Sequence, residues 1–182
     1  MSNDNFSLLL IFTILAVASL TDLLYRRIPN WLTLSSLICG IFFQIFFKGF
    51  DGFLASLQGI GIGFALTFVV YLVGGLGAGD VKLMAALGAF LGPKEIFMAF
   101  IFSSLLSGAY ALVLLILHGF ILQTIKRYFK MLRALIFTLQ LIYIPPLSEE
   151  KRLGIRFGVM IALGTLWAKF YVGNLPFNKL LG

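Results

Sequence analysis

Long hydrophobic runs separated by short polar breaks make up most of this chain. Six such runs recur along its 182 residues. Most of them approach the roughly 20 residues that an α-helix needs to cross a bilayer. Glycine, proline and charged residues occupy the breaks, where helices end or turn. The pattern predicts an all-α, polytopic membrane protein with about six transmembrane helices, at residues 6–24, 31–47, 53–73, 80–91, 96–117 and 157–172.

Small residues indicate how some of these helices pack. The fourth run, residues 80–91, is marginal as a full span because it has only about a dozen residues, and it is rich in alanine and glycine. We therefore expect it to be buried inside the bundle. Gly59, Gly61 and Gly63 in the third run would let a neighbouring helix approach closely. Cys39, the single cysteine of the chain, is expected to be a small packed hydrophobic residue.

Residues 119–153 have a different pattern, in which basic and apolar residues alternate at helical spacing. Lys126, Lys130 and Arg133 share one helix face, and the apolar residues fall mainly on another. This pattern predicts an amphipathic helix that lies on the anionic cytoplasmic leaflet. In an alternative interpretation, residues 132–144 belong to a further membrane span.

The composition supports a membrane protein with the lipid bilayer as its partner. Hydrophobic residues make up 60% of the chain and charged residues 12%, whereas soluble domains have about 25% charged residues. The net charge of +7 would raise the question of nucleic acid in a soluble protein. Here the basic residues cluster at the ends of apolar runs, without the aromatic and basic patch of a nucleic-acid site. We therefore expect a single membrane domain over 1–182 and no nucleic-acid partner.

The basic residues also predict the orientation of the chain. Placing Arg26, Arg27, Lys82 and the stretch through Arg156 on one side puts ten of the fourteen Lys and Arg residues there. The positive-inside rule makes that side cytoplasmic, with both termini outside. Asp22 and Asp80 then both fall at the cytoplasmic ends of their helices, although the charge count did not use them.

These two acids are the candidate chemistry of the chain. A carboxylate within a membrane segment costs several kcal/mol, roughly, and Asp80 sits there after the glycine-rich break Gly77-Ala78-Gly79. Two nearby carboxylates cannot comfortably both ionise. The ionised one can take a proton from water while the protonated one polarises a peptide carbonyl. In the alternative, Asp80 is only the N-cap of its helix, and Lys82 is either a counter-ion or a topology marker.

Three motifs, in order, resemble those of the type IV prepilin peptidase family. The first joins Asp22 to Ile28-Pro29-Asn30-Trp31-Leu32-Thr33. The second is Gly77-Ala78-Gly79-Asp80-Val81-Lys82-Leu83-Met84-Ala85, and the third runs from Arg156 to Gly164. The resemblance covers nearly the whole chain, and the combination is far more specific than a lone Gly-x-Gly-Asp.

The resemblance implies a six-helix aspartic peptidase of the inner membrane. It would remove the short basic leader from pilin, pseudopilin or preflagellin precursors at the cytoplasmic face, with Asp22 and Asp80 as catalytic residues. Gly77, Gly79, Lys82, Pro29 and Asn30 would bind substrate or shape the site. The resemblance implies neither a metal nor another cofactor. Because longer members carry a cytoplasmic domain before the peptidase core and also methylate the product, we expect a peptidase-only form without a methyltransferase domain.

Two other functions remain open at this point. The same acids would serve as ion ligands in an ion- or proton-coupled transporter, although no internal repeat pairs two broken helices. A presenilin-like intramembrane protease shares Gly-x-Gly-Asp, but its other acid usually follows tyrosine, whereas Asp22 follows Thr21. The substrate, the source and the oligomeric state are not indicated.

Overall fold

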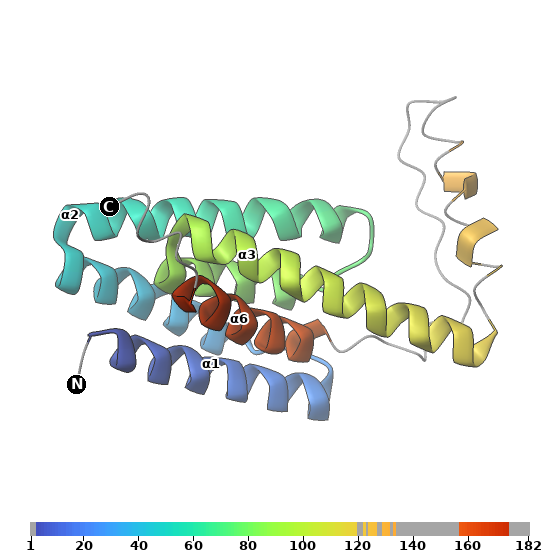
Figure 1. Ribbon diagram of the computed structural model, residues 1–182, viewed down its shortest axis with the longest axis horizontal. Coiled ribbons are helices and arrows are strands. Elements are labelled where there is room, and N and C mark those ends of the chain that lie inside the picture. The colour runs from blue at the N-terminus through green and yellow to red at the C-terminus, as the bar shows by residue number, and fades with distance from the viewer. Residues whose placement is uncertain are drawn as a thin grey trace. The chain divides into compact units, whose positions relative to one another are not determined.

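The computed structural model describes residues 3–119, 122, 124–126, 129–131, 133 and 157–174, with side chains for all of these except 3–5 and 171–174. Every regular element in this part of the chain is an α-helix (Figure 1). The helices are α1 (Asn3–Tyr25), α2 (Asn30–Leu72), α3 (Ala78–His118) and α6 (Phe157–Asn174). The predicted all-α fold class is confirmed.

The chain divides into two compact units, 1–106 with 156–182, and 107–155. The second unit holds the end of α3, and its described residues after Gly119 are helical. The predicted amphipathic helix of 119–153 lies mostly outside the described residues, so it stays a prediction. The contacts among α1, α2, the first part of α3 and α6 lie within the first unit.

Two left-handed glycines divide the long helices into the predicted segments. α2 is 43 residues long and is interrupted at Gly49, where φ is 61°. α3 is 41 residues long and is interrupted at Gly92, where φ is 74°. Glycine adopts this conformation without the clash that a Cβ would cause. Figure 1 shows α2 as two arms that run back along each other, so α2 and α3 each contain two of the predicted helices.

The number of membrane crossings stays a prediction. Three helical segments, Phe6–Tyr25, Asn30–Leu72 and Ala78–His118, are long and apolar enough to cross a membrane, and Phe157–Phe170 is a shorter apolar helix. A straight helix of α2's length would span about 65 Å, roughly twice the hydrocarbon thickness of a bilayer. The breaks at Gly49 and Gly92 remove this mismatch, which supports about six spans.

The first arm of α3, residues 78–91, forms the centre of the unit, as predicted. Its residues from Leu83 to Leu91 are all buried. Both arms of α2 reach it through glycines: a Cβ at Gly40 would lie 2.7 Å from the Cβ of Ala89. A Cβ at Gly59 would overlap the carbonyl oxygen of Gly88. Gly63 has a similar contact, but Gly61 has nothing within 4 Å, so its predicted packing role is wrong.

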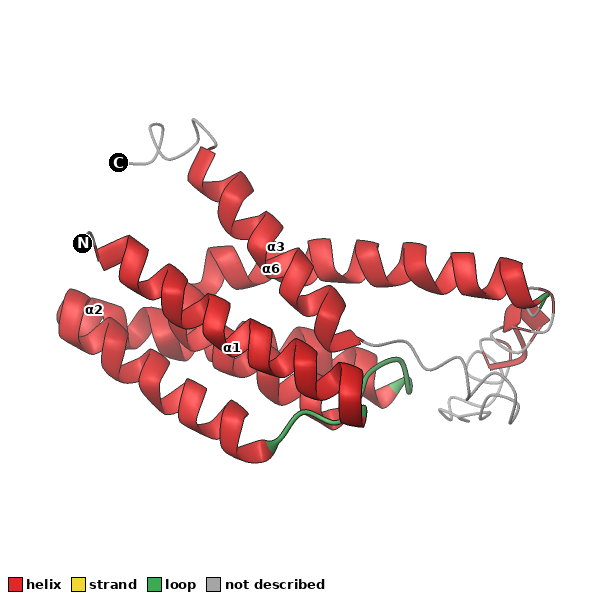
Figure 2. Ribbon diagram, turned by 90° about the horizontal axis from the view of Figure 1, so that it is seen from below, coloured by secondary structure: helices red, strands yellow, loops and turns green. Residues whose placement is uncertain are grey.

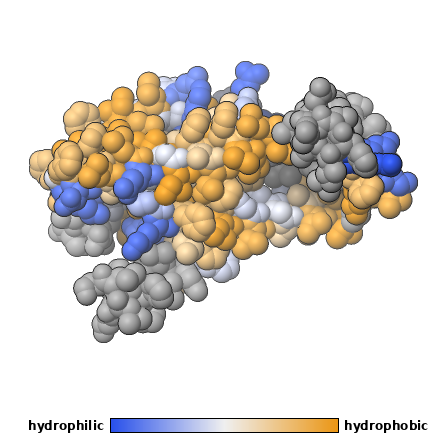
Figure 3. Space-filling model, turned by 90° about the horizontal axis from the view of Figure 1, so that it is seen from above, coloured by the Kyte–Doolittle hydropathy of each residue, from blue (hydrophilic) through white to orange (hydrophobic). Residues whose placement is uncertain are grey.

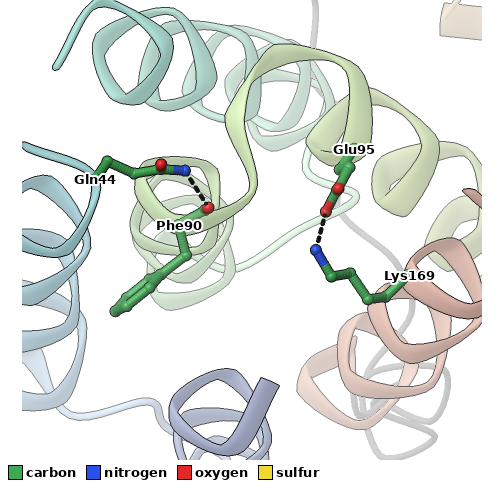
Figure 4. Close-up of polar contacts among 4 residues, drawn as sticks. All are labelled: Gln44, Phe90, Glu95 and Lys169. Carbon is green, nitrogen blue, oxygen red and sulfur yellow. Dashed lines mark hydrogen bonds and ion pairs between the residues drawn. The ribbon is translucent and has the colours of Figure 1, made fainter. Parts of the chain in front are cut away.

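Side chains from α2 satisfy the buried C-terminal end of this arm. The last carbonyls of a helix lack intrahelical partners, and lipid offers no water to replace them. Gln44 Nε2 donates to the Phe90 carbonyl at 2.7 Å (Figure 4). Ser56 Oγ donates to the Ala89 carbonyl, also at 2.7 Å. These two hydrogen bonds offset the cost of burying the carbonyl groups at the end of a helix inside the bundle.

Removing either cap is expected to destabilise the fold. Gln44→Leu or Ser56→Ala leaves one buried carbonyl unsatisfied, which costs about 1–3 kcal/mol. Unfolding in mixed micelles by increasing SDS would measure the loss. Gln58→Leu and Ser35→Ala are matched controls, because both side chains are exposed. Equal resistance to SDS in cap and control variants would contradict the capping role.

α6 packs against α1 and against α3. α1 has contacts with both α6 and α2. The ring of Trp167 stacks on that of Phe102, with 5.8 Å between the centroids. Lys169 Nζ donates to Glu95 Oε2 at 2.8 Å, as Figure 4 also shows. A Cβ at Gly164 would overlap Ser103 Oγ. These contacts hold the middle of α6 against α3.

The outer face of the helices is hydrophobic, as expected for contact with lipid. Large exposed apolar residues occur on α1, α2, α3 and α6, and hydrophobic side chains cover most of the face shown in Figure 3. Cys39 is exposed on α2, so its predicted packing is wrong. A bilayer removes the cost of exposing a small apolar side chain. The lipid-facing side and the core are therefore both apolar, and the hydrophobic periodicity of the sequence did not distinguish them.

Candidate active site

A cavity of about 480 Å³ lies where the end of α1 meets the starts of α2 and α3. Its walls come from the two loops that join these helices and from the helix turns beside them. Figure 2 shows these loops in green. The lining contains both predicted catalytic acids and all five residues predicted to shape the site: Asp22, Arg26, Arg27, Ile28, Pro29, Asn30, Gly77, Ala78, Gly79, Asp80 and Lys82. The structure thus brings together residues from two motifs, of which one ends at Thr33 and the other begins at Gly77.

Asp22 lies in the last turn of α1 and is 9% exposed. Its Oδ2 accepts a hydrogen bond of 2.9 Å from the backbone N–H of Gly158. Gly158 is the second residue of α6, so this contact joins residues 136 positions apart. The carboxylate is therefore held by the N-terminal turn of another helix.

Asp80 is the third residue of α3 and is also 9% exposed. Its Oδ2 accepts a hydrogen bond of 3.0 Å from the backbone N–H of Gly77. An acidic side chain that reaches back in this way forms one half of a capping box. Asp80 is thus not the N-cap residue itself, which corrects the alternative interpretation, although it does help to begin the helix.

The two carboxyl groups line the same cavity. Helix N-termini gather around them: Asn30 begins α2 and Ala78 begins α3, while Gly158 lies in the first turn of α6. The positive ends of helix dipoles favour negative charge nearby. In the described part of the chain, no group of three His, Cys, Asp or Glu residues lies together.

Arg26 ends α1 with a left-handed backbone conformation, and the chain after it runs along the cavity. Arg26 has φ 54°, and its N–H donates to the Asp22 carbonyl at 3.0 Å. Pro29, with φ −66° and ψ 139°, then precedes the first residue of α2. This turn places the segment from Arg26 to Asn30 in the cavity wall.

Two contacts connect this wall to the start of α3. Lys82 Nζ donates to Asn30 Oδ1 at 2.9 Å. A Cβ at Gly79 would lie 3.2 Å from the Cβ of Ile28, so glycine allows the loop to pack closely there. Lys82 lines the same cavity as both acids and its hydrogen bond is with Asn30, so its role as counter-ion or topology marker stays a prediction.

Gly158 is the residue of this site to which the sequence assigned no role. Its contribution is a backbone N–H, which every residue except proline has, and it lies far from both acids in sequence. The sequence offered one signal, a glycine at the start of the last apolar helix. In the structure, a Cβ at this glycine would lie against Asp22.

The helical membrane fold and the two buried acids in one cavity define a polytopic membrane protein with a two-carboxylate site. The model of the type IV leader peptidase family matches residues 9–112, and the chain belongs to this family. The predicted resemblance is thereby confirmed.

One relative indicates which members of the family are similar. The prepilin leader peptidase/N-methyltransferase of Bacillus subtilis (strain 168) is 32% identical over 117 residues, which cover 60% of this chain and 44% of that protein. The match therefore spans less than half of the relative's length. No solved structure matches the chain.

Proposed function

We propose that this chain is a membrane aspartic endopeptidase that removes the short basic leader from type IV prepilin-like precursors. The observation that carries the proposal is the pair of buried acids, Asp22 and Asp80, lining one cavity in a member of the leader peptidase family. The relative's name includes a second activity, N-methyltransferase, which we do not extend to this chain.

In the proposed reaction the two carboxyl groups hold one proton between them. The ionised carboxylate takes a proton from a water molecule, whose oxygen attacks the carbonyl carbon of the scissile peptide. The protonated carboxyl donates its proton to the carbonyl oxygen, giving a tetrahedral diol. Return of a proton from the diol and protonation of the leaving nitrogen break the C–N bond. Such a pair titrates as a unit, so neither acid is assigned as the base.

The surroundings of the acids support this mechanism. One oxygen of each carboxylate accepts a backbone N–H, from Gly158 or from Gly77. Backbone donors do not change rotamer, so they fix the carboxyl planes toward the cavity before substrate arrives. Gly77 and Gly79 carry no side chain over the cavity, which allows an extended peptide backbone to approach.

The cytoplasmic location of the site is part of the proposal. Arg26, Arg27 and Lys82 line the cavity, and they belong to the basic set that the positive-inside rule places in the cytoplasm. The precursor would present its leader there while its apolar segment stays in the bilayer.

Incubating the purified protein in liposomes with a prepilin-like precursor tests the proposed function. Mass spectrometry is expected to find one new N-terminus, at the boundary between leader and mature protein. A cut in the middle of the apolar segment would favour a presenilin-like protease instead. An ion or proton flux that depends on Asp80, without any cleavage, would favour a transporter.

We expect the Lys82–Asn30 hydrogen bond to hold the two walls of the cavity in a fixed position relative to each other. Lys82→Met should lower kcat/KM by about tenfold, because one exposed hydrogen bond to a charged group is lost. Asn30→Ala should have a similar effect, and the double variant should add little to either single change. Steady-state cleavage kinetics measure this, with Lys94→Met as the control. Fully additive effects would show that the two residues act separately.

A further inference from the structure

The backbone at the start of α6 is in direct contact with Asp22. The N–H of Gly158 lies 2.9 Å from Asp22 Oδ2, in a buried position. A Cβ built on Gly158 would lie 2.9 Å from Asp22 Oδ2, 3.0 Å from Asp22 Cβ and 3.2 Å from Asp22 Cγ. Real Cβ atoms rarely approach side-chain atoms so closely, so any larger residue would displace the carboxylate.

The N–H groups in the first turn of a helix have no partner within that helix. The Gly158 N–H is one of them, and Asp22 satisfies it. When Asp22 is the ionised member of the pair, this hydrogen bond is about twice as strong as one between neutral groups, and low polarity around it strengthens it further. The contact therefore restricts both the position and the rotation of the Asp22 carboxyl group.

We propose that Gly158 is a positioning residue for the peptidase reaction, through which α6 completes the active site by holding Asp22 in its productive orientation. This inference rests on the proposed function. It assigns a role to a helix that lies beyond the family match at 9–112. Gly158 does not react with substrate but acts through Asp22.

The rest of α6 is built to keep this N–H in place. The Lys169–Glu95 ion pair at 2.8 Å and the stacking of Trp167 on Phe102 hold α6 to α3. Gly164, further along the same helix, packs so closely that a Cβ would overlap Ser103. Both positions exclude a Cβ, but Gly158 faces the side chain of the catalytic acid, whereas Gly164 faces the backbone as well as the side chain of Ser103 on α3, which is a tighter limit.

This pair of glycines provides a matched test. Gly158→Ala is expected to lower kcat by about 100-fold with little change in KM, since a displacement of about 1 Å at a reacting group can cost that much. Gly164→Ala, which forces the middle of the same helix away from Ser103, should reduce resistance to SDS unfolding and lower kcat by less than Gly158→Ala does. A loss of kcat in Gly164→Ala as large as that in Gly158→Ala would overturn the proposal, because general packing of α6 would then explain both.

A second variant removes only the hydrogen bond. Replacing Gly158 by glycolic acid converts its backbone N–H into an ester oxygen and adds no atom that clashes with Asp22. We expect kcat to fall by about tenfold or more, as for loss of a hydrogen bond to a charged group, with SDS resistance close to that of the wild type. This variant keeps the test valid even if Gly158→Ala does not fold.

Wild-type cleavage measured in the same assay separates the two proposals. If the wild type cuts the precursor and the ester variant cuts with the same kcat, Gly158 has no positioning role while the proposed function stands. If the wild type cuts nothing, the proposed function itself fails. If the wild type cuts and both Gly158 variants lose kcat at unchanged KM, the inference is supported.

Discussion

Asp22→Asn and Asp80→Asn are each expected to abolish leader cleavage, with kcat reduced by about 10³-fold or more. Asparagine keeps the size of the side chain and can still accept a hydrogen bond from the Gly158 or Gly77 backbone. It can neither take a proton from water nor give one to the scissile carbonyl. Proton transfer by one positioned group contributes about 10²–10⁴-fold, and the two acids act on the same proton.

Asp51 provides a control. Asp51→Asn, at an exposed position on α2, should leave kcat unchanged. The double variant of Asp22 and Asp80 should be no slower than either single variant, because groups that act as a unit are strongly non-additive. Normal cutting by either single variant, in a folded protein, would show that the carboxylate pair is not the catalytic machinery.

The second large effect is expected at the closest helix crossing. Gly59→Ala and Gly88→Ala should each cost at least about 3 kcal/mol of folding free energy, at the upper end of overpacking effects. A Cβ at either position would overlap the carbonyl oxygen of the other glycine. The obstructing atoms are backbone, so no side chain can rotate away and the helices have to separate. SDS unfolding in mixed micelles measures this loss.

Gly61→Ala is the matched control for this crossing. Gly61 lies on the same arm of α2, and a Cβ added there would have nothing within 4 Å. Alanine should therefore be neutral or slightly stabilising through its higher helix propensity. Equal SDS resistance in the Gly59, Gly61 and Gly88 variants would mean that the two backbones do not approach each other as described.

The helices and their breaks were predictable because their signals are local. Membrane segments must be apolar over a fixed length, and the left-handed breaks at Gly49 and Gly92 require glycine. The caps at Gln44 and Ser56 were not predictable, since their partners are 46 and 33 residues away. Cys39 was misplaced because the core and the lipid-facing surface of a membrane helix are both apolar.

Some residues of the candidate site were likewise predictable from local signals in the sequence, and others were not. Asp22 and Asp80 stood out because a charge in an apolar segment is costly, and the motifs around them indicated Pro29, Asn30 and Lys82. The contact between Lys82 and Asn30 needed the folded chain. Gly158 lies within the third motif, but its contribution is a backbone N–H, so only the structure relates it to Asp22.

The most direct test of the carboxylate pair is a structure of the Asp80→Asn variant with an intact leader peptide bound. We expect the scissile carbonyl to lie in the cavity, with Asp22 and the residue 80 amide close enough to contact one bridging water, at about 3 Å from each. A scissile bond outside the cavity, or side chains at 22 and 80 too far apart to share a water, would contradict the two-acid account.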